Sequence, residues 1–382
     1  MRYRDFKLVE SRVFLKEAEA RIQHAEDIVF WEGSRGAIRA LESLKKLEQG
    51  GHQDVTIKWD GSPAIIFGRN EDGEFILTDK SGFGAKGYDG KSKSGEELEQ
   101  MFLNRSGGKN RENPGYVAFA GNMRSIFDLY ERATPQDFRG FLKGDLLYYN
   151  TPQVKNNNYT FKPNIVEYAV DVNSDLGKRI GQSKTGVVVH RYIDANGNES
   201  AVPPGIDFQG NDVLIFPSVT VQKAPQIDDE DINQLKATVA KNASAIDSLL
   251  DKTALTELKI SDFAQILYTY TNSKVDTGLE NLGADFFDWL SKSKLTLQKQ
   301  NRIVEYIKAN EAGFNALWQI VTGIMQIKDK VISQFDSHDA EVKANIPGHG
   351  EGGEGYVLAH PQGDIKLVPR EFFTRANRAV QR

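Results

Sequence analysis

The chain has 382 residues, of which 39% are hydrophobic and 26% charged, a composition typical of a folded, water-soluble protein. Its formal net charge of −5 excludes an overall basic surface, so any nucleic-acid-binding surface must be local. The absence of cysteine excludes disulfides, thiolate zinc sites and a cysteine nucleophile. Because neither a secretory signal nor a run of eighteen apolar residues is present, we expect a cytoplasmic protein with no membrane partner.

The first two thirds of the chain predict a helix followed by several strands. Residues 10–48 are predicted to be helical, because apolar residues recur at helical spacing from Ile38 to Leu47, with Ser34 as an N-cap. Residues 54–79 then predict strands that include a hairpin with an Asp-Gly turn. Helical segments follow up to about residue 132, and further strands are predicted at 138–150, 165–172, 185–193 and 211–219.

A helical block interrupts this pattern. No proline occurs between Pro225 and Pro347, and apolar residues line one helical face at Phe314, Leu317, Trp318, Val321, Ile324 and Met325. Two short strands follow, in "GYVLAHP" and "DIKLVPR". The expected fold is α+β, with a core in two parts, 1–225 and 346–382, and an all-helical insertion at 226–345.

The stretch "TIKWDGSPAIIFG" at residues 56–68 places Lys58 in an apolar strand, immediately before a turn. A lysine in this position is either a solvent-facing residue of an edge strand or a nucleophile. Apolar surroundings disfavour the ammonium form and increase the fraction of free amine. The later motifs decide between these two interpretations.

Four short motifs occur in order along the chain. The KWDG of residues 58–61 resembles motif I (K-x-D-G) of the covalent nucleotidyltransferases, which comprise ATP-dependent DNA ligases, RNA ligases and mRNA capping enzymes. The KGDLL of 143–147 is similar to motif III, the EGYV of 354–357 to motif IV, and the IKLV of 365–368 to motif V. The resemblance covers about 54–193 and 346–370 and implies a core of antiparallel sheets with flanking helices.

The resemblance also implies the chemistry. Lys58 would attack the α-phosphorus of ATP, and Lys366 would stabilise the charge that develops on the phosphate. Asp145 and Glu354 would hold Mg²⁺, which prefers carboxylate and water oxygens. Tyr168 is expected to stack on the adenine. The full set expected to bind the cofactors ATP and Mg²⁺ is Ile57, Lys58, Asp60, Gly61, Lys80, Asp145, Tyr168, Glu354 and Lys366.

The length of chain after motif V favours one branch of this superfamily. DNA ligases and capping enzymes carry an OB domain there, and the sixteen residues that follow Lys366 are too few for one. The chain therefore resembles phage RNA-ligase-like proteins most closely. This implies joining of a 5′-phosphate to a 3′-hydroxyl end, with RNA as partner and, if the protein is phage-encoded, the host cytoplasm as location. The helical insertion is expected to bind structured RNA, a protein partner or a second copy.

Three alternatives stay open. Ser62-Pro63 after motif I and Asp364, at a position where motif V usually has a lysine, depart from the family pattern. These departures permit two alternatives: an adenylyltransferase that acts on another acceptor, or a binding protein with weakened chemistry. The third reading is a P-loop NTPase, because "AKGYDGKS" (85–92) fits a loose Walker A pattern that would depend on Lys91. Asp89 inside the would-be phosphate loop argues against it.

Overall fold

The structure of the chain, a computed structural model, describes residues 23–84, 92–203, 208–337, 342–348, 350–373 and 375. The fold is α+β, as expected, and it divides into two compact units. The helical unit comprises the described parts of Met1–Lys58, Val219–Asp339 and Glu354–Arg382. The sheet unit comprises those of Trp59–Ser218 and Ala340–Gly353. The predicted helical insertion thus shares a unit with the N-terminal helix and the last strands.

The helical unit contains one small sheet with the strand order β1-β15-β14-β2. Its strands are β1 (Gln23–His24), β2 (Val55–Ile57), β14 (Tyr356–Leu358) and β15 (Ile365–Leu367). β1 and β15 are parallel, and the other pairs are antiparallel. The helices are α2 (Ile28–Lys46), α7 (Asp229–Leu249), α8 (Lys252–Glu257), α9 (Phe263–Ser273), α10 (Leu282–Lys292), α11 (Leu297–Ala309) and α12 (Glu311–Asp336), and short 3₁₀ turns occur at Leu47–Gln49, Gly51–Asp54 and Lys274–Asp276.

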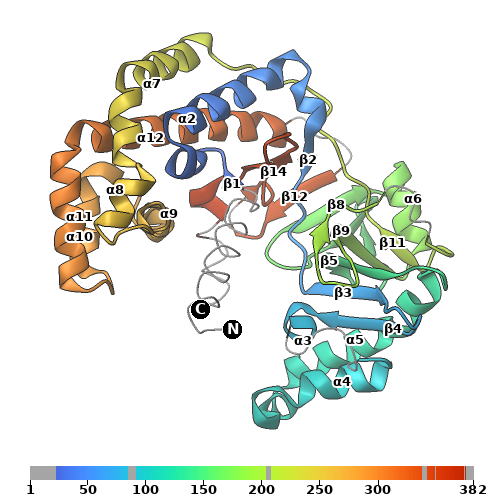
Figure 1. Ribbon diagram of the computed structural model, residues 1–382. Coiled ribbons are helices and arrows are strands. Elements are labelled where there is room, and N and C mark those ends of the chain that lie inside the picture. Colours follow the sequence, from blue (N-terminus) through green and yellow to red (C-terminus); the bar gives the residue numbers. More distant parts are fainter. Residues whose placement is uncertain are drawn as a thin grey trace. The chain divides into compact units, whose positions relative to one another are not determined.

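Helix α12 is the longest helix of this unit, and α2 and α7 pack against it (Figure 1). All six residues predicted to share one helical face, from Phe314 to Met325, are buried, so this prediction is confirmed. Gly323 of α12 allows α7 to approach closely, because a Cβ there would lie 2.5 Å from Leu235 Cδ2. Among the described residues, no helix combines the length and apolarity needed to cross a membrane.

The predicted helix 10–48 is only partly correct. Residues 10–22 lie outside the described residues, and residues 23–24 form strand β1 because they pair with β15. Within α2 the chain kinks at Gly33, whose φ of 63° is non-helical, and the second helical segment begins at Ser34. Ser34 does not cap it with its own side chain. Its N–H and its hydroxyl both donate to Asp247 of α7, each over 2.8 Å.

The sheet unit contains a sheet with the order β10-β9-β5-β3-β4, in which β11 lies parallel beside β9. The predicted β3–β4 hairpin is present, and Gly73 in its turn has a φ of +83°. Helices α4 and α5 share a buried core with this sheet. The strands are β3 (Ala64–Arg69), β4 (Phe75–Asp79), β5 (Gly140–Tyr148), β9 (Thr185–Ile193), β10 (Glu199–Ser200) and β11 (Val213–Ile215); the helices are α3 (Lys80–Gly84), α4 (Gly95–Leu103), α5 (Pro114–Ala133) and α6 (Asp175–Gln182), with a 3₁₀ segment at Arg105–Glu112.

A second sheet of this unit has the order β13-β12-β8-β7-β6. Only β8 lies in a segment predicted as a strand. Strand β12 corrects the expectation that residues 226–345 are all helical, since its residues pair with β8 through Val342 and Val170 instead of continuing α12. The strands are β6 (Gln153–Lys155), β7 (Asn158–Phe161), β8 (Glu167–Asp171), β12 (Val342–Ile346) and β13 (Gly350–Glu351).

Candidate active site

The small sheet of the helical unit has one apolar face and one polar face. Val55, Leu358 and Ile365 lie in register across three strands and are buried in the helical core. Side chains of successive strand residues point to opposite faces. The next row, in register across all four strands, is His24, Lys366, Val357 and Thr56, and it therefore lies on the face away from that core.

Lys58 joins this polar face at the end of β2. Its N–H donates to the carbonyl of Gly355 over 2.9 Å, which extends the β2–β14 ladder by one residue and places its side chain on the same side as that of Thr56. The Lys58 ammonium forms an ion pair with Glu354, and both side chains are mostly buried, with 26% and 16% exposed.

The edge-strand explanation for Lys58 does not hold. β2 pairs with β14 on one side. On the other side the Ile57 N–H donates to the Val219 carbonyl and the Val221 N–H donates to the Val55 carbonyl, both over 2.9 Å. β2 is therefore flanked on both sides, and Lys58 is an internal residue with a carboxylate partner.

Gly355 explains why a glycine follows Glu354. Its φ is +117°, and a Cβ at this position would lie 2.3 Å from the Leu367 carbonyl oxygen of β15. No side chain fits such a gap. The glycine lets β14 approach β15 closely and lets its own carbonyl reach Lys58, so the acidic-Gly pattern of 354–355 serves to position the ion pair.

Lys366 of β15 pairs in register with Val357 of β14 on one side and with His24 of β1 on the other. Burial lowers the pKa of Lys366, and the nearby charge of Lys58 lowers it further, against the opposing effect of Glu354. Two lysines thus share this face with one carboxylate. A bound anion would relieve the repulsion between them.

A network of four buried charges fixes the ends of β1 and β15. Lys328 of α12 donates to both Glu26 oxygens over 2.9 and 3.0 Å. Arg370 binds Asp27 in bidentate fashion, with one contact of 2.9 Å, and all four side chains are at most 2% exposed. Burial raises the pKa of Asp27 to about 6, although the charge of Arg370 opposes this shift. Asp27 lies just after β1 and Arg370 just after β15, so the network holds the two strands that carry His24 and Lys366.

In the sheet unit, Asp60 and Tyr168 act within the chain itself. The Asp60 carboxylate accepts from the N–H groups of Ile165 (2.9 Å) and Val166 (3.1 Å) and from the Asn164 amide (2.9 Å). The Asp60 N–H donates to the Tyr168 hydroxyl over 2.6 Å. Both residues therefore anchor the 164–168 segment to the turn that follows Lys58.

Tyr168 differs from its expected role. Its side chain is fully buried, and its ring packs against Trp59 and Phe161 at centroid distances of 4.8 and 5.6 Å. A fully buried ring has no face free for an adenine, so the expectation that Tyr168 stacks on the base is not met in this structure. Its hydroxyl and its ring stabilise the turn instead.

Gly61 and Asp145 lie together in the sheet unit. A Cβ on Gly61 would lie 2.5 Å from the Asp145 Cβ, so only glycine fits. The partly exposed Asp145 carboxylate contacts His190 Nε2 over 2.9 Å. His190 falls at an irregularity of the β5–β9 ladder, where Lys143 pairs with Arg191 and the next residue pairs with Val189.

His190 contacts the predicted site residue Asp145, and the sequence analysis did not select it as a site residue. It reads as the packed or turn-bonded end of an apolar strand, whereas it is exposed and turned to Asp145. The extra residue in β9 places it there, and β-bulges are frequent beside functional sites. The sequence carries no signal for the bulge.

The remaining predicted residues are placed as follows. The Ile57 side chain is partly buried and packs against the core of the helical unit. Lys80 is exposed at the start of α3. Lys91 and most of the Walker-like segment lie outside the described residues. The structure thus brings together Lys58, Glu354 and Lys366 in one unit, and Asp60, Gly61, Asp145 and Tyr168 in the other.

The two carboxylates predicted to bind Mg²⁺ are of the ligand type that this ion prefers. Among the described residues, no group of three or more His, Asp or Glu side chains gathers in a way that could hold a metal. Mg²⁺ bound to nucleotide phosphates needs only one or two protein carboxylates. Glu354 and Asp145 each offer one, in separate units.

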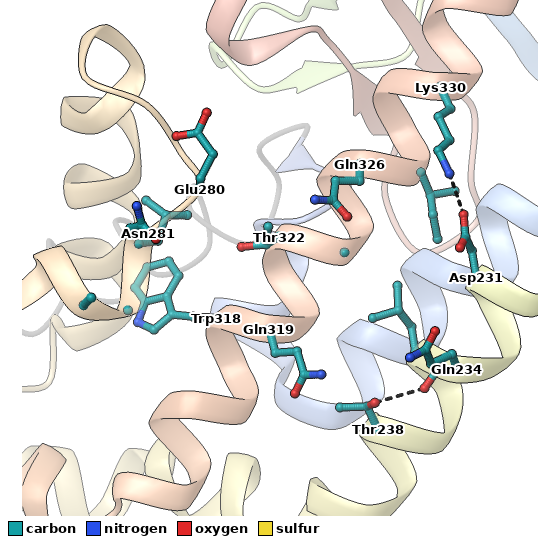
Figure 2. A pocket seen from close by; sticks show the side chains of 16 residues that line it. Asp231, Gln234, Thr238, Glu280, Asn281, Trp318, Gln319, Thr322, Gln326 and Lys330 are labelled. Carbon is teal, nitrogen blue, oxygen red and sulfur yellow. Dashed lines mark hydrogen bonds and ion pairs between the residues drawn. The ribbon is translucent and has the colours of Figure 1, made fainter.

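A hollow of about 520 Å³ lies elsewhere in the helical unit, on α12 between α7 and residues 280–284 (Figure 2). Amide and hydroxyl side chains line it, and Lys330 at its edge pairs with Asp231 over 2.6 Å. None of the predicted site residues lines this hollow.

Comparison with known proteins assigns the chain to a family. The model of a family of unknown function (DUF6267) matches residues 19–90 and 112–382, and the chain belongs to this family. The match includes the four motifs and the whole helical block. No curated protein and no solved structure matches the chain.

Proposed function

We propose that the protein is an ATP-dependent RNA ligase that works through a lysyl-AMP intermediate on Lys58. One observation carries the proposal. Lys58, Glu354 and Lys366 come from distant parts of the sequence and meet on one face of one four-stranded sheet. These are the residues that the resemblance assigns to motifs I, IV and V, and a residue constellation is stronger support for chemistry than a fold alone.

In the first step, the neutral amine of Lys58 attacks the α-phosphorus of ATP. A P–N bond forms, the bond from the α-phosphorus to the bridging oxygen breaks, and pyrophosphate leaves with the bonding electrons. The nitrogen, which is cationic after attack, gives one proton to solvent and becomes the neutral nitrogen of a phosphoramidate. A lysine can act in this way when its surroundings favour the free amine and hold it in line with the electrophile.

The neighbours of Lys58 have distinct parts in this step. Glu354 holds the Lys58 nitrogen in place before attack through the ion pair. Lys366, fixed on β15, would stabilise the negative charge that builds up on the α-phosphate oxygens. Mg²⁺, when bound with the nucleotide, would neutralise phosphate charge and make pyrophosphate a better leaving group. Glu354 is the candidate Mg²⁺ ligand in the helical unit. Asp145, in the sheet unit, stays a predicted Mg²⁺ ligand.

In the later steps, the AMP would pass from Lys58 to the 5′-phosphate of an RNA strand. The 3′-hydroxyl of a second strand would then attack that phosphate, form a phosphodiester and release AMP. The preference for RNA rests on the resemblance to phage RNA-ligase-like proteins. The helical part of the chain, which the resemblance does not cover, would hold the RNA or a partner.

Discharge of a labelled intermediate tests the proposal. The protein is incubated with α-³²P-labelled ATP and Mg²⁺, freed of nucleotide, and mixed with RNA carrying a 5′-phosphate. Matched strands are the same RNA with a 5′-hydroxyl and the corresponding 5′-phosphorylated DNA. We expect label to leave the protein for the 5′-phosphorylated RNA alone and to be released as AMP when a 3′-hydroxyl end is joined.

Other outcomes favour the alternatives. Label that stays on the protein with every strand indicates an adenylyltransferase for a different acceptor. A protein that binds ATP but is never labelled indicates a binding protein with this fold. ATP hydrolysis without labelled protein, abolished by Lys91→Ala, indicates a P-loop NTPase.

A further inference from the structure

His24 occupies a place on the polar face that the four motifs do not account for. It pairs in register with Lys366 on the neighbouring strand, so the two side chains share one face of the sheet. Its ring is only partly buried. It also precedes Glu26 and Asp27, which the buried ion pairs to Lys328 and Arg370 hold in place.

The ring nitrogens of His24 have no partner in the part of the chain that the structure describes. Nδ1 is buried without a hydrogen bond, and no hydrogen bond to the ring is present at Nε2. Such a group costs free energy unless a ligand or water completes it. Burial lowers the pKa of His24 well below its usual value, and the charges of Arg370, Lys328, Lys366 and Lys58 lower it further. A neutral imidazole ring has one N–H to donate.

We propose that His24 binds the phosphate chain of ATP, its ring N–H donating a hydrogen bond to a non-bridging phosphate oxygen beside Lys366. A phosphate oxygen can only accept, and a neutral imidazole supplies the donor without adding charge to a face that already carries two lysines. The inference rests on the proposed function in that ATP is the ligand. It makes His24 a phosphate-binding residue upstream of motif I, outside the four motifs.

Three substitutions separate the roles of the ring atoms. His24→Leu removes both nitrogens. His24→Asn places a donor near the position of Nδ1, and His24→Gln places one near Nε2. Affinity for ATP and for inorganic tripolyphosphate is measured by calorimetry, and lysyl-AMP formation by labelling, with thermal melting as the check on folding.

We expect His24→Leu to weaken both ATP and tripolyphosphate about tenfold or more, as the loss of a hydrogen bond to a charged group does. One of the two amide variants should restore most of the affinity. Adenosine, which has no phosphate, should bind the variants and the wild type equally.

The inference is overturned if His24→Leu binds tripolyphosphate as tightly as the wild type does. It is also overturned if the loss of affinity is accounted for by a loss of folded protein, seen as a lower melting temperature. Its failure is distinct from that of the ligase proposal. A wild type that binds tripolyphosphate through His24 but forms no lysyl-AMP contradicts the ligase alone. Equal lysyl-AMP formation and equal binding in wild type and His24→Leu contradict the role of His24 alone.

Discussion

Lys58 and Glu354 form an ion pair at the neighbouring ends of β2 and β14, two strands that lie far apart in the sequence. The pair is supported from the backbone, because the Lys58 N–H donates to the carbonyl of Gly355. The contact joins the lysine of the KWDG stretch (58–61) to the acid of the EGYV stretch (354–357).

Glu354→Gln should lower the rate of lysyl-AMP formation by about 10²-fold, the order of magnitude found when one preorganised electrostatic partner is removed from an active site. The amide keeps the size of the side chain but loses the charge that holds the Lys58 nitrogen. The measurement is the initial rate of labelling at saturating ATP. Glu42→Gln, which alters an exposed carboxylate of α2, is the control and should leave the rate unchanged. A Glu354→Gln rate equal to that of the wild type would remove Glu354 from the site.

Gly355→Ala should destabilise the protein and disturb the ion pair together. An added Cβ would lie 2.3 Å from the Leu367 carbonyl oxygen, and the φ of +117° is unfavourable for alanine. Gly363→Ala is the matched control, since Gly363 lies between β14 and β15 with a φ of +109° and open space around its Cβ position. Chemical unfolding should show a cost of about 1 kcal/mol for the control, from backbone strain alone, and clearly more for Gly355→Ala. Equal costs would show that the β14–β15 approach does not depend on glycine.

Lys328→Met should reduce the free energy of unfolding by about 3–5 kcal/mol, the usual cost of breaking a buried ion pair from one side. Lys328 is fully buried and is bound to Glu26, which would keep only Arg370 at 3.4 Å. Lys330→Met, two residues along the same helix, removes an exposed lysine paired with Asp231. It should cost no more than about 1 kcal/mol. Urea unfolding monitored by circular dichroism measures both variants, and similar values for the two would contradict the account of the buried network.

His24 should make the protein less stable in mild acid. Its pKa is lowered in the folded state, first by burial and then by nearby cations, whereas the unfolded chain has a pKa of about 6.5. Below that pH the unfolded state binds a proton that the folded state does not, so the free energy of unfolding falls as the pH drops. The contribution is at most about 1.4 kcal/mol per pH unit.

His24→Asn removes this titration. Urea unfolding at pH 7 and pH 5 should therefore show a smaller acid-induced loss in the variant than in the wild type. Identical losses in the two proteins would mean that His24 has an ordinary pKa in the folded chain.

The sequence predicts the helices and strands of this protein better than it predicts which strands pair with one another. The apolar stripe of α12 and the β3–β4 hairpin follow from spacing and turn chemistry, which are local properties. Strand β12 does not, because its five residues become a strand only through pairing with β8. Likewise, β1 is a strand only because β15 lies beside it.

The candidate site shows the same division. The order of the motifs predicts Lys58, Glu354 and Lys366 as site residues, and all three lie in the helical unit. The burial of Tyr168 and the binding of the Asp60 carboxylate by the Ile165 and Val166 N–H groups and the Asn164 side chain depend on segments more than one hundred residues apart in sequence. No local pattern reports such burial, nor the bulge that aims His190 at Asp145.

The most direct test of the central claim is mass spectrometry of the protein after incubation with ATP and Mg²⁺, followed by proteolysis to locate any adduct. The account predicts a mass increase of one AMP on the peptide that contains Lys58, absent from Lys58→Arg, whose guanidinium is not a nucleophile at neutral pH. Lys366→Ala should form the same adduct more slowly. An adduct on another residue, or an unmodified Lys58 in a protein shown to bind ATP, would contradict the account.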